Sequence, residues 1–273
     1  MELGGVFMHD TSMDRPRVLV LAGRRAGGDA LATATGQTHR ALLPIAGVPM
    51  LLRVLRTLRA SHVRLPIAVT ADDPAILHAN EELARMTDAG ELSFHAAGAS
   101  PATSVAEYFD TCAEGSALFV TTADHPLLTP DIIGHFLAEA TASRADFVVG
   151  LVASAVYRAK FPDQPRTFIE LRDEKFSGAN LFLLRTPRAL EVPRFWTRAE
   201  AYRKKPWRLA GVFGMSSLAL FLAGRLDLAM AMDRVSRVIG AQIGTVLLPF
   251  AEAALDVDKE ADRVIAERLL GGA

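Results

Sequence analysis

Two loops of this sequence carry residues that could form a functional site, one by binding phosphate and the other by holding a metal ion. In the first, Gly23–Ala32, glycines and the guanidinium groups of Arg24 and Arg25 directly follow an apolar run. Backbone N–H groups in such a loop can converge on phosphate oxygens, and arginine adds a planar fork of donors. The loop has neither the Gly-Lys-Ser/Thr of a P-loop nor the glycine spacing of a dinucleotide site. It predicts another kind of nucleotide site, against the alternative of a glycine-rich surface loop without a ligand.

The second loop, Thr121–Pro130, places Asp124 directly after another apolar run and ahead of a proline. A carboxylate at the tip of a strand can hold Mg²⁺ while the ion also takes phosphate oxygens of a substrate. An aspartate in this place can also cap the helix that follows. The sequence pattern alone leaves both roles of Asp124 open.

These loops need a sheet to bring them together, and the hydrophobic pattern predicts one. The run Arg17–Ala22 is apolar and β-branched and breaks at Gly23, which is typical of a strand buried on both faces. Further strands are predicted at Pro66–Thr70, Leu92–Ala96, Ala117–Thr122 and Phe147–Ala153, and helices at Val48–Arg59, Pro74–Met86, Ala102–Ala113 and Pro130–Ala142. This alternation predicts an α/β fold, a mostly parallel mixed sheet sandwiched by helices. Ligands of such sheets bind at the carboxyl ends of the strands, where both loops begin.

The pattern changes after about residue 154. Later elements are predicted as short strands at Thr167–Leu171 and Ala179–Leu184 around a polar loop at Arg172–Ser177, helical residues at Ser216–Ile239, a strand at Thr245–Pro249 and a last helix at Lys259–Leu270. We predict a flexible tail at residues 1–16 and a single domain at residues 17–273. An insertion at about residues 154–240 belongs to that domain.

The composition excludes several classes of protein. The 273 residues are 50% hydrophobic, and 30 Lys and Arg against 31 Asp and Glu give a formal charge of -1, unlike a disordered chain or a protein that coats nucleic acid. The single cysteine, Cys112, rules out an intrachain disulfide and a thiolate zinc site. Residues 1–25 lack the apolar core of a secretory signal, and Leu209–Gly224 is too short and too interrupted to cross a bilayer. We therefore expect a cytoplasmic protein.

The segments Leu21–Arg25 and Arg40–Leu52 resemble the signature of nucleotidyltransferases with a glycosyltransferase-A-like fold. These include the molybdenum cofactor guanylyltransferases, the methylerythritol phosphate cytidylyltransferases and the sugar-1-phosphate nucleotidyltransferases. Their pattern is a strand, a glycine loop with an arginine, a lysine, and then a proline and Gly-x-Pro-Leu before a helix. The positions that fall on it here are Gly23, Arg25, Pro44, Gly47 and Pro49. Arg40 stands in place of the phosphate-binding lysine, which keeps the charge but not the compact ammonium geometry.

The resemblance implies a nucleotide site and a metal site. The nucleotide would be contacted by Leu21, Ala22, Gly23, Arg24, Arg25, Arg40, Ser104 and Asp124, of which Arg25, Arg40 and Asp124 would act in catalysis. Asp258 lies in a segment similar to the closing Val-Asp-Thr-Pro-Glu-Asp-Leu of these enzymes and would join Asp124 as the second ligand of Mg²⁺. The alternative for Asp258 is an acidic helix start that serves stability alone.

The resemblance also implies contacts to the base and to a second substrate, the acceptor. Ser104 falls in register with a base-contacting serine of the cytidylyltransferases, although Pro101 replaces their arginine, and a plain helix cap is its alternative role. Gly178 and Asn180 lie in a segment similar to the strand that faces the acceptor. Lys175 is near them in the sequence and would offset phosphate charge.

The function so implied is transfer of NMP from an NTP to a phosphorylated small-molecule or lipid-precursor acceptor, with release of pyrophosphate. Ser104 favours CTP, with GTP next. Two other functions stay open. One is a glycosyltransferase of the same fold that uses a nucleotide sugar, although this chain has Thr122-Ala-Asp124 where Asp-x-Asp is usual. The other is a degenerate nucleotide-binding protein without enzymatic activity, which Arg40 in place of lysine keeps open.

A basic stretch, Arg194–Arg208, interleaves four aromatic residues with arginines and lysines. The simpler interpretation is a solvated helix whose aromatic side chains pack inward. The other is a surface for phospholipid head groups, which predicts a peripheral membrane contact through residues 194–224 or an acceptor that is a lipid precursor.

Overall fold

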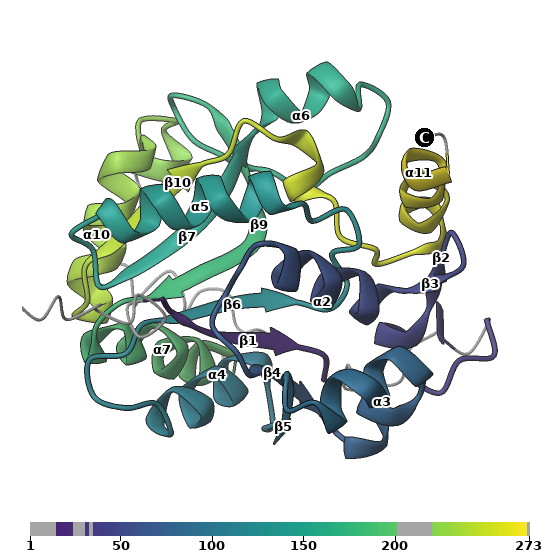
Figure 1. Ribbon diagram of the computed structural model, residues 1–273. Coiled ribbons are helices and arrows are strands. Elements are labelled where there is room, and N and C mark those ends of the chain that lie inside the picture. Colours follow the sequence, from purple (N-terminus) through teal and green to yellow (C-terminus); the bar gives the residue numbers. More distant parts are fainter. Residues whose placement is uncertain (1–14, 24–30, 33–34, 201–219, 272–273) are drawn as a thin grey trace, which may run out of the picture.

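The computed structural model describes residues 15–23, 31–32, 35–200 and 220–271, and its core is a twisted sheet between two layers of helices (Figure 1). The first strand, β1 (Arg17–Leu21), lies near the middle, and its Val18, Leu19 and Val20 are fully buried. A run of β-branched and leucine side chains favours this place because both faces of the strand are covered. The predicted tail lies almost wholly outside the described residues.

The sheet has the strand order β10-β7-β9-β6-β1-β4-β5. Besides β1 it contains β4 (Ile67–Ala71), β5 (Leu92–Ala96), β6 (Leu118–Thr122), β7 (Phe147–Ala153), β9 (Lys175–Leu184) and β10 (Ile243–Leu247), with the short β8 (Ile169–Glu170) paired to β9. All neighbours are parallel except β9, which is antiparallel to β6 and to β7. The predicted α/β class with a mostly parallel mixed sheet is confirmed.

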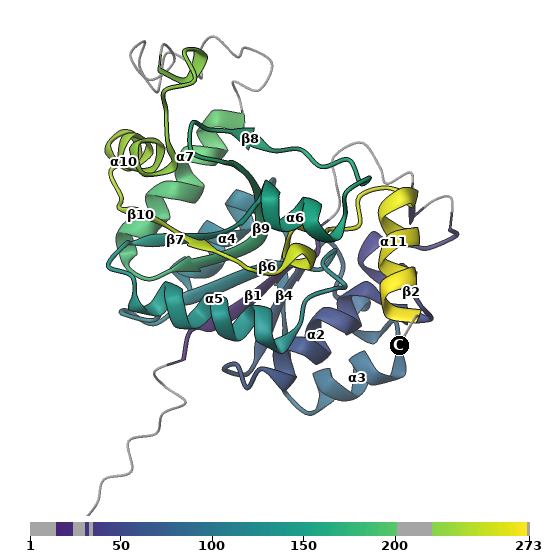
Figure 2. The same ribbon diagram turned by 90° about the horizontal axis from the view of Figure 1, so that it is seen from above.

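Helices cover both faces of the sheet (Figure 2). One hydrophobic core joins Val18 and Val20 to α2 (Met50–Ala60) and α5 (Pro130–Ala142), with α3 (Glu81–Asp88), α6 (Ser154–Lys160) and α11 (Glu260–Gly271) at its margin. The second core joins Leu19 to α4 (Pro101–Asp110), α7 (Glu191–Glu200) and α10 (Leu228–Ile239). The alternation of side chains along β1 therefore assigns neighbouring residues to opposite layers. Among the described residues, no helix is long and apolar enough to cross a membrane.

A small hairpin precedes α2, where the sequence predicted a helix from Val48. Its strands β2 (Pro44–Ile45) and β3 (Val48–Pro49) are joined by Ala46 and Gly47, which have φ values of 46° and 75°. Two positive φ angles are what a tight two-residue hairpin turn requires, and glycine adopts them without strain. Pro49 consequently ends β3 and occupies the N-cap position of α2, so the helix begins at Met50, two residues later than predicted.

The expected helix at Pro74–Met86 is wrong as a single element. Residues Pro74–His78 form a 3-10 turn, η2, and α3 begins after Asn80. The side chain of Asn80 accepts a hydrogen bond of 2.8 Å from the backbone N–H of Glu82, which caps the new helix and interrupts the old one.

Other boundaries in the second half of the chain also differ. The predicted polar loop Arg172–Ser177 is partly strand, because β9 begins at Lys175 and pairs with β8 and β7. Within the helical residues predicted at Ser216–Ile239, residues 220–222 are helical and the chain then turns before α10 begins at Leu228. Asp227 caps α10 by accepting from Met230 N–H at 2.8 Å, and residues 216–219 lie outside the described residues. The sequence pattern did not predict α6. The single-domain boundaries and the insertion stay predictions.

Candidate functional site

The carboxyl ends of β1 and β6 meet at one edge of the sheet, where the two loops that the sequence singled out begin. Leu21 lies opposite Thr122, and the N–H of Ala123 donates to the Leu21 carbonyl at 2.9 Å. On the other side of β1, the N–H of Ala22 donates to the Thr70 carbonyl at 2.9 Å. The backbone before Asp124 is therefore fixed to the backbone before Gly23. The predicted phosphate contacts Arg24 and Arg25 lie outside the described residues.

Three carboxylates lie together at this edge. One oxygen each of Asp124, Asp256 and Asp258 lies within 4.8 Å of the others. Asp256 and Asp258 follow a 3-10 turn, η4 (Ala251–Ala254), and flank Val257, which is fully buried. The N–H of Val257 donates to the Asp124 carbonyl at 2.9 Å. Because Val257 enters the core, its two neighbours are held at the surface beside Asp124.

Asp124 is the most electrostatically constrained of the three. Its side chain is 22% exposed, and its Oδ1 atom is buried with no hydrogen-bond partner among the described residues. Burial raises the pKa of Asp124, and the nearby carboxylates of Asp256 and Asp258 raise it further, while the Thr122 side chain and the guanidinium of Arg40 lower it. Placing like charges close together in a partly dry site is costly unless a cation joins them. The arrangement therefore attracts positive charge.

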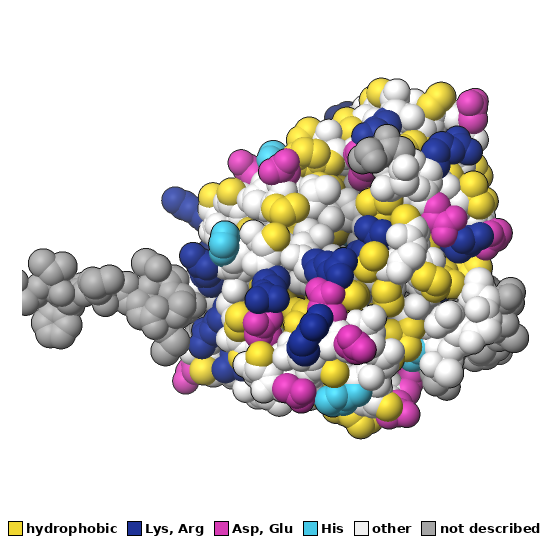
Figure 3. All heavy atoms as spheres, turned by 45° about the vertical axis from the view of Figure 1, so that its right-hand side comes forward, with side chains coloured by type: hydrophobic (Ala, Val, Ile, Leu, Met, Phe, Trp, Pro, Cys, Tyr) yellow, Lys and Arg dark blue, Asp and Glu magenta, His cyan; other side chains and the backbone are white. Residues whose placement is uncertain are grey.

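Arg40 supplies part of that charge. It begins a 3-10 turn, η1 (Arg40–Leu42), which His39 caps by accepting from the Ala41 N–H at 3.1 Å. The Nη2 of Arg40 donates to the Val257 carbonyl and to the carboxylate of Asp258, and it lies 3.6 Å from Oδ2 of Asp124. The structure thus brings together three residues that the sequence placed far apart, Arg40, Asp124 and Asp258. In the view that brings this side forward, basic and acidic side chains lie next to one another (Figure 3).

Arg166 connects the carboxylates to β9. Its Nε donates to Ser177 Oγ at 2.8 Å, its Nη2 donates to the Gly178 carbonyl at 3.3 Å, and its Nη1 pairs with Asp256. Asn180, with a φ of 52°, reaches the other oxygen of Asp256 at 3.5 Å. Two predicted acceptor residues, Gly178 and Asn180, are therefore joined to the carboxylate cluster through Asp256.

Lys175 and Ser104 make other contacts. Lys175 pairs at 2.6 Å with Glu170 across the exposed β8–β9 hairpin. The buried hydroxyl of Ser104 accepts from the Gly98 N–H at 2.9 Å and donates to the Ser100 carbonyl at 3.2 Å. Ser100, rather than Ser104, caps α4 by accepting from the Thr103 N–H. Ser104 thus closes the loop before α4, and its contact with a base stays a prediction.

Sequence reasoning missed Asp256 and Arg166. Asp256 lies in the segment that was compared with the family's closing motif, but the alignment with that motif indicated only Asp258 as a metal ligand. Its signal was the alternation Asp-Val-Asp, which places two carboxylates on the same side of an extended chain whose middle residue is buried. Arg166 stands between a proline and a threonine with no pattern around it, so only the fold reveals its place.

Comparisons with known proteins identify the family and the fold. The family model of the MobA-like NTP transferase domain matches residues 18–169. A hypothetical transferase from Thermus thermophilus is 30% identical with a TM-score of 0.75, and the match covers 91% of this chain and 99% of that one. A CMP:2-keto-3-deoxy-manno-octonic acid synthetase complexed with CTP shares the fold at 14% identity and a TM-score of 0.56, covering 94% of this chain and 99% of that one. No curated protein matches the sequence.

The fold is also that of a 4-diphosphocytidyl-2C-methyl-D-erythritol synthase from Anaerococcus prevotii, which is 9% identical with a TM-score of 0.57. This match covers 96% of this chain and 100% of that one. The family match includes β1 from Val18 onward, Arg40 and Asp124, and it extends over more than half of the 273 residues. With the relative at 30% identity over nearly its whole length, this places the chain among the nucleotidyltransferases, as a member of the MobA-like NTP transferase domain family.

Proposed function

We propose that this chain transfers a nucleoside monophosphate from an NTP to a phosphorylated acceptor and releases pyrophosphate. The observation that supports it most is that Arg40, Asp124 and Asp258 meet at the edge of the sheet where the Gly23 loop begins. A triphosphate with a divalent cation needs that combination, because guanidinium groups bind phosphate oxygens and carboxylates bind the ion. Leu21 and Ala22, with Arg24 and Arg25, complete the proposed nucleotide site.

Mg²⁺ is the proposed cofactor, and the carboxylates present fit it. The buried Oδ1 of Asp124 has no hydrogen-bond partner among the described residues, so it has an acceptor to offer. The three carboxylate oxygens lie within 4.8 Å of one another, and opposite ligands of one Mg²⁺ lie about 4.2 Å apart, so a shift of less than about 1 Å would suffice. Asp124 and Asp258 would hold the ion, with Asp256 as a third ligand. A bound ion supplies charge neutralisation at the phosphates.

The transfer is a displacement at the α-phosphorus. An oxygen of the acceptor phosphate forms the new bond to phosphorus, and the bond from phosphorus to the oxygen that bridges to the β-phosphate breaks. The electron pair of that bond leaves with pyrophosphate. A phosphomonoester is largely ionised at pH 7, because its second pKa is about 6, so the protein needs no general base.

The chain's own residues position the two substrates and offset their charge. Arg40 would contact the β- and γ-phosphates of the NTP, and its charge would be worth most in a site from which water is partly excluded. Gly178 and Asn180, with Lys175 at the end of the same strand, would contact the acceptor. The bonds from Arg166 to Ser177 and Gly178 hold this strand in place.

CTP is the proposed donor, with GTP next. Support comes from the register of Ser104 with the cytidylyltransferases and from the structural neighbour that is complexed with CTP. A peripheral membrane contact through residues 194–224 is also proposed. In the described part of this segment, α7 exposes Arg194, Trp196 and Arg198 while Phe195 is buried. Co-sedimentation with anionic vesicles at low salt tests the contact, and absence of binding would exclude it.

A second candidate, nucleotide binding without transfer, is favoured by one observation. Arg40 is held against the carboxylates that would hold the cation. If Arg40 does not move away from the carboxylates when the ion arrives, the chain binds a nucleotide but does not neutralise the charge that develops during transfer. Calorimetry with CTP, GTP, UTP and ATP, each with and without Mg²⁺, separates the two candidates when pyrophosphate release is measured in parallel.

The decisive variant is Asp124→Asn, which keeps the shape of the side chain but removes its charge. We expect pyrophosphate release to fall at least about a hundredfold, as for the loss of one strong electrostatic contact to a transition state. Asp131→Asn, on the exposed first turn of α5, is the matched control and should keep full activity. An Asp124→Asn variant as active as this control would overturn the proposed metal site.

A further inference from the structure

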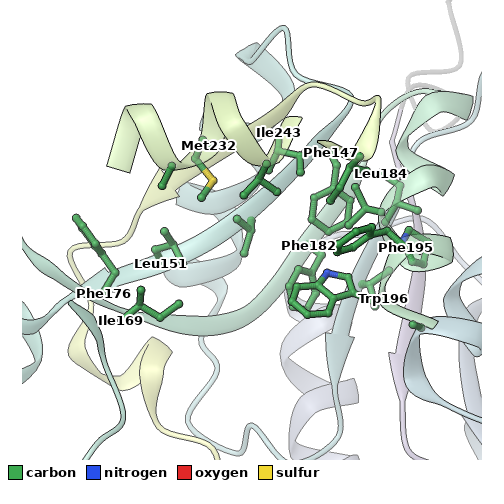
Figure 4. A pocket seen from close by; sticks show the side chains of 18 of the residues that line it. Phe147, Leu151, Ile169, Phe176, Phe182, Leu184, Phe195, Trp196, Met232 and Ile243 are labelled. Atoms are coloured by element: carbon green, nitrogen blue, oxygen red, sulfur yellow. The ribbon is translucent and has the colours of Figure 1, made fainter. Parts of the chain in front are cut away.

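A cavity of about 580 Å³ lies on the face of the sheet that α4, α7 and α10 cover. Strands β6, β7, β9 and β10 form its floor, and the two helices α7 and α10 stand on either side (Figure 4). Phe182, Phe195 and Trp196 lie toward one end, and Leu151 and Phe176 toward the other. Its volume falls within the range of about 300–1,000 Å³ that is usual for sites that bind small molecules.

The lining of this cavity is apolar throughout. Every residue that lines it, among those the structure describes, is aliphatic, aromatic, proline or methionine. Burying a polar group against such a lining without a partner is unfavourable, and water has few partners there as well. The group that would fill the cavity is therefore a hydrocarbon.

The cavity begins beside the candidate active site. Leu21 lines it, and the carbonyl of this residue accepts from the N–H of Ala123, the residue before Asp124. On the other side, Leu151 lines the cavity and lies opposite Gly178 in the β7–β9 register. A molecule with its phosphate at the carboxylate edge could thus extend its remaining part along β7 and β9 into the cavity.

The rim of the cavity exposes large apolar side chains. Ile169 is 62% exposed, Trp196 is 53% exposed and Phe221 is 45% exposed, and all three line the cavity. Exposed apolar groups gathered at the mouth of a pocket mark a surface that meets an apolar partner. A tryptophan at such a rim also offers an N–H to the polar end of an amphipathic molecule.

We propose that the acceptor is a phosphorylated lipid whose hydrocarbon chain occupies this cavity while its phosphate lies beside Asp124 and Asp258. The inference rests on the proposed function for the reaction at the phosphate. The occupancy of the cavity itself can be measured without any reaction.

Binding of alkyl monophosphates of four, eight and twelve carbons, below their micelle concentrations, tests this directly. Calorimetry on the full chain should show an affinity that rises about fourfold for each added methylene until the cavity is full. Affinity that does not depend on chain length would overturn the proposal.

The matched variants are on α10. Ala231→Trp fills the cavity from its lining, whereas Ala229→Trp adds the same side chain on the exposed face of the same helix. We expect Ala231→Trp to weaken dodecyl phosphate binding at least tenfold and to leave CTP binding unchanged, with Ala229→Trp unchanged in both. Leu228→Trp, also in the lining, serves if Ala231→Trp fails to fold. Equal affinities in the lining and control variants would refute the assignment.

Two further outcomes assign the cavity otherwise. A dimer by light scattering that Ala231→Trp abolishes, together with no binding of dodecyl phosphate, would assign the face to a second copy of the chain. Pyrophosphate release separates the remaining cases. Equal kcat/KM for butyl and dodecyl phosphate would overturn the lipid acceptor and leave the transferase. Tight dodecyl phosphate binding without release of pyrophosphate, with any NTP, would overturn the proposed function and the acceptor role, and leave a hydrocarbon site.

Discussion

Arg40 and a divalent cation compete for the same carboxylates, so removing the guanidinium should strengthen metal binding. The guanidinium lies 3.6 Å from Oδ2 of Asp124 and bonds to Asp258, and its side chain is only 11% exposed. Arg40→Gln removes the charge and keeps much of the volume. A nucleotide-free protein with this substitution should therefore bind Mg²⁺ more tightly than the natural chain.

The size of the effect follows from Coulomb's law. An ion bound to Asp124 would lie about 4 Å from the guanidinium, and a charge of two repelled by a charge of one at that distance costs about 2 kcal/mol even at the dielectric constant of water. The partial burial of both side chains makes this a lower bound. The Mg²⁺ affinity of Arg40→Gln should rise at least about thirtyfold. Its affinity for a triphosphate should fall, by at least about fivefold, because one phosphate contact is lost.

Calorimetric titration with MgCl₂ and then with CTP measures both changes on one sample. The matched control is Arg56→Gln. Arg56 lies on the surface of α2 and pairs with Glu82 of α3. This control variant should leave both affinities unchanged. For Arg40→Gln the Mg²⁺ affinity should rise while the CTP affinity falls, whereas a general loss of structure would weaken both affinities. Unchanged or weaker Mg²⁺ binding by Arg40→Gln would show that the cation does not bind between Asp124 and Asp258.

Two further predictions concern the surrounding fold. Asn180 has a φ of 52°, so Asn180→Ala should lower the free energy of unfolding by about 1 kcal/mol, and Asn180→Gly should lower it by less. Urea unfolding of both variants measures these changes, and equal decreases in the free energy of unfolding would contradict the prediction. Burial raises the pKa of the Cys112 thiol, so iodoacetamide should react with it more slowly at pH 8 than with the unfolded chain. Because the pKa of Cys112 is higher in the folded protein than in the unfolded chain, its contribution to the free energy of unfolding is present below about pH 8.5 and is lost as the pH rises through the folded pKa. A Cys112→Ala variant whose free energy of unfolding has the same pH slope as that of the natural chain would refute this.

The sequence was most informative where local patterns and packing agree. The strand at Leu92–Ala96 and the helix at Pro130–Ala142 have the predicted boundaries, because alternation or a proline after a capping threonine defines them locally. The helix at Pro74–Met86 failed because one asparagine side chain restarts the helix, an effect that apolar spacing does not reveal. Strand β9 was predicted too short because Lys175, Ser177 and Gly178 interrupt its apolar pattern, and its first residues are held by pairing with distant β7.

The candidate site divides in the same way. Asp124 and the Gly23 loop could be placed from sequence because each directly follows a strand, and parallel strands end at one edge. Asp256 carried only the alternation Asp-Val-Asp and Arg166 carried no pattern, because their pairing depends on how the chain before β8 and the chain after η4 cross the carboxyl ends of the strands. Periodicity describes elements one at a time, whereas such a crossing is a property of the packed sheet.

The antiparallel strand β9 explains why the site and the cavity adjoin. Its last residues pair with β6 only from Leu118 to Val120, so β6 has no β9 partner along Thr121 and Thr122. Before that point β9 pairs with β7 and with the short β8, and its pairing to β7 has an irregularity between Val149 and Leu151. A bulge of this kind bends a strand away from its neighbour. Pairing between β6 and β9 therefore ends before Asp124, at the edge where the proposed acceptor would pass from the carboxylates to the apolar cavity.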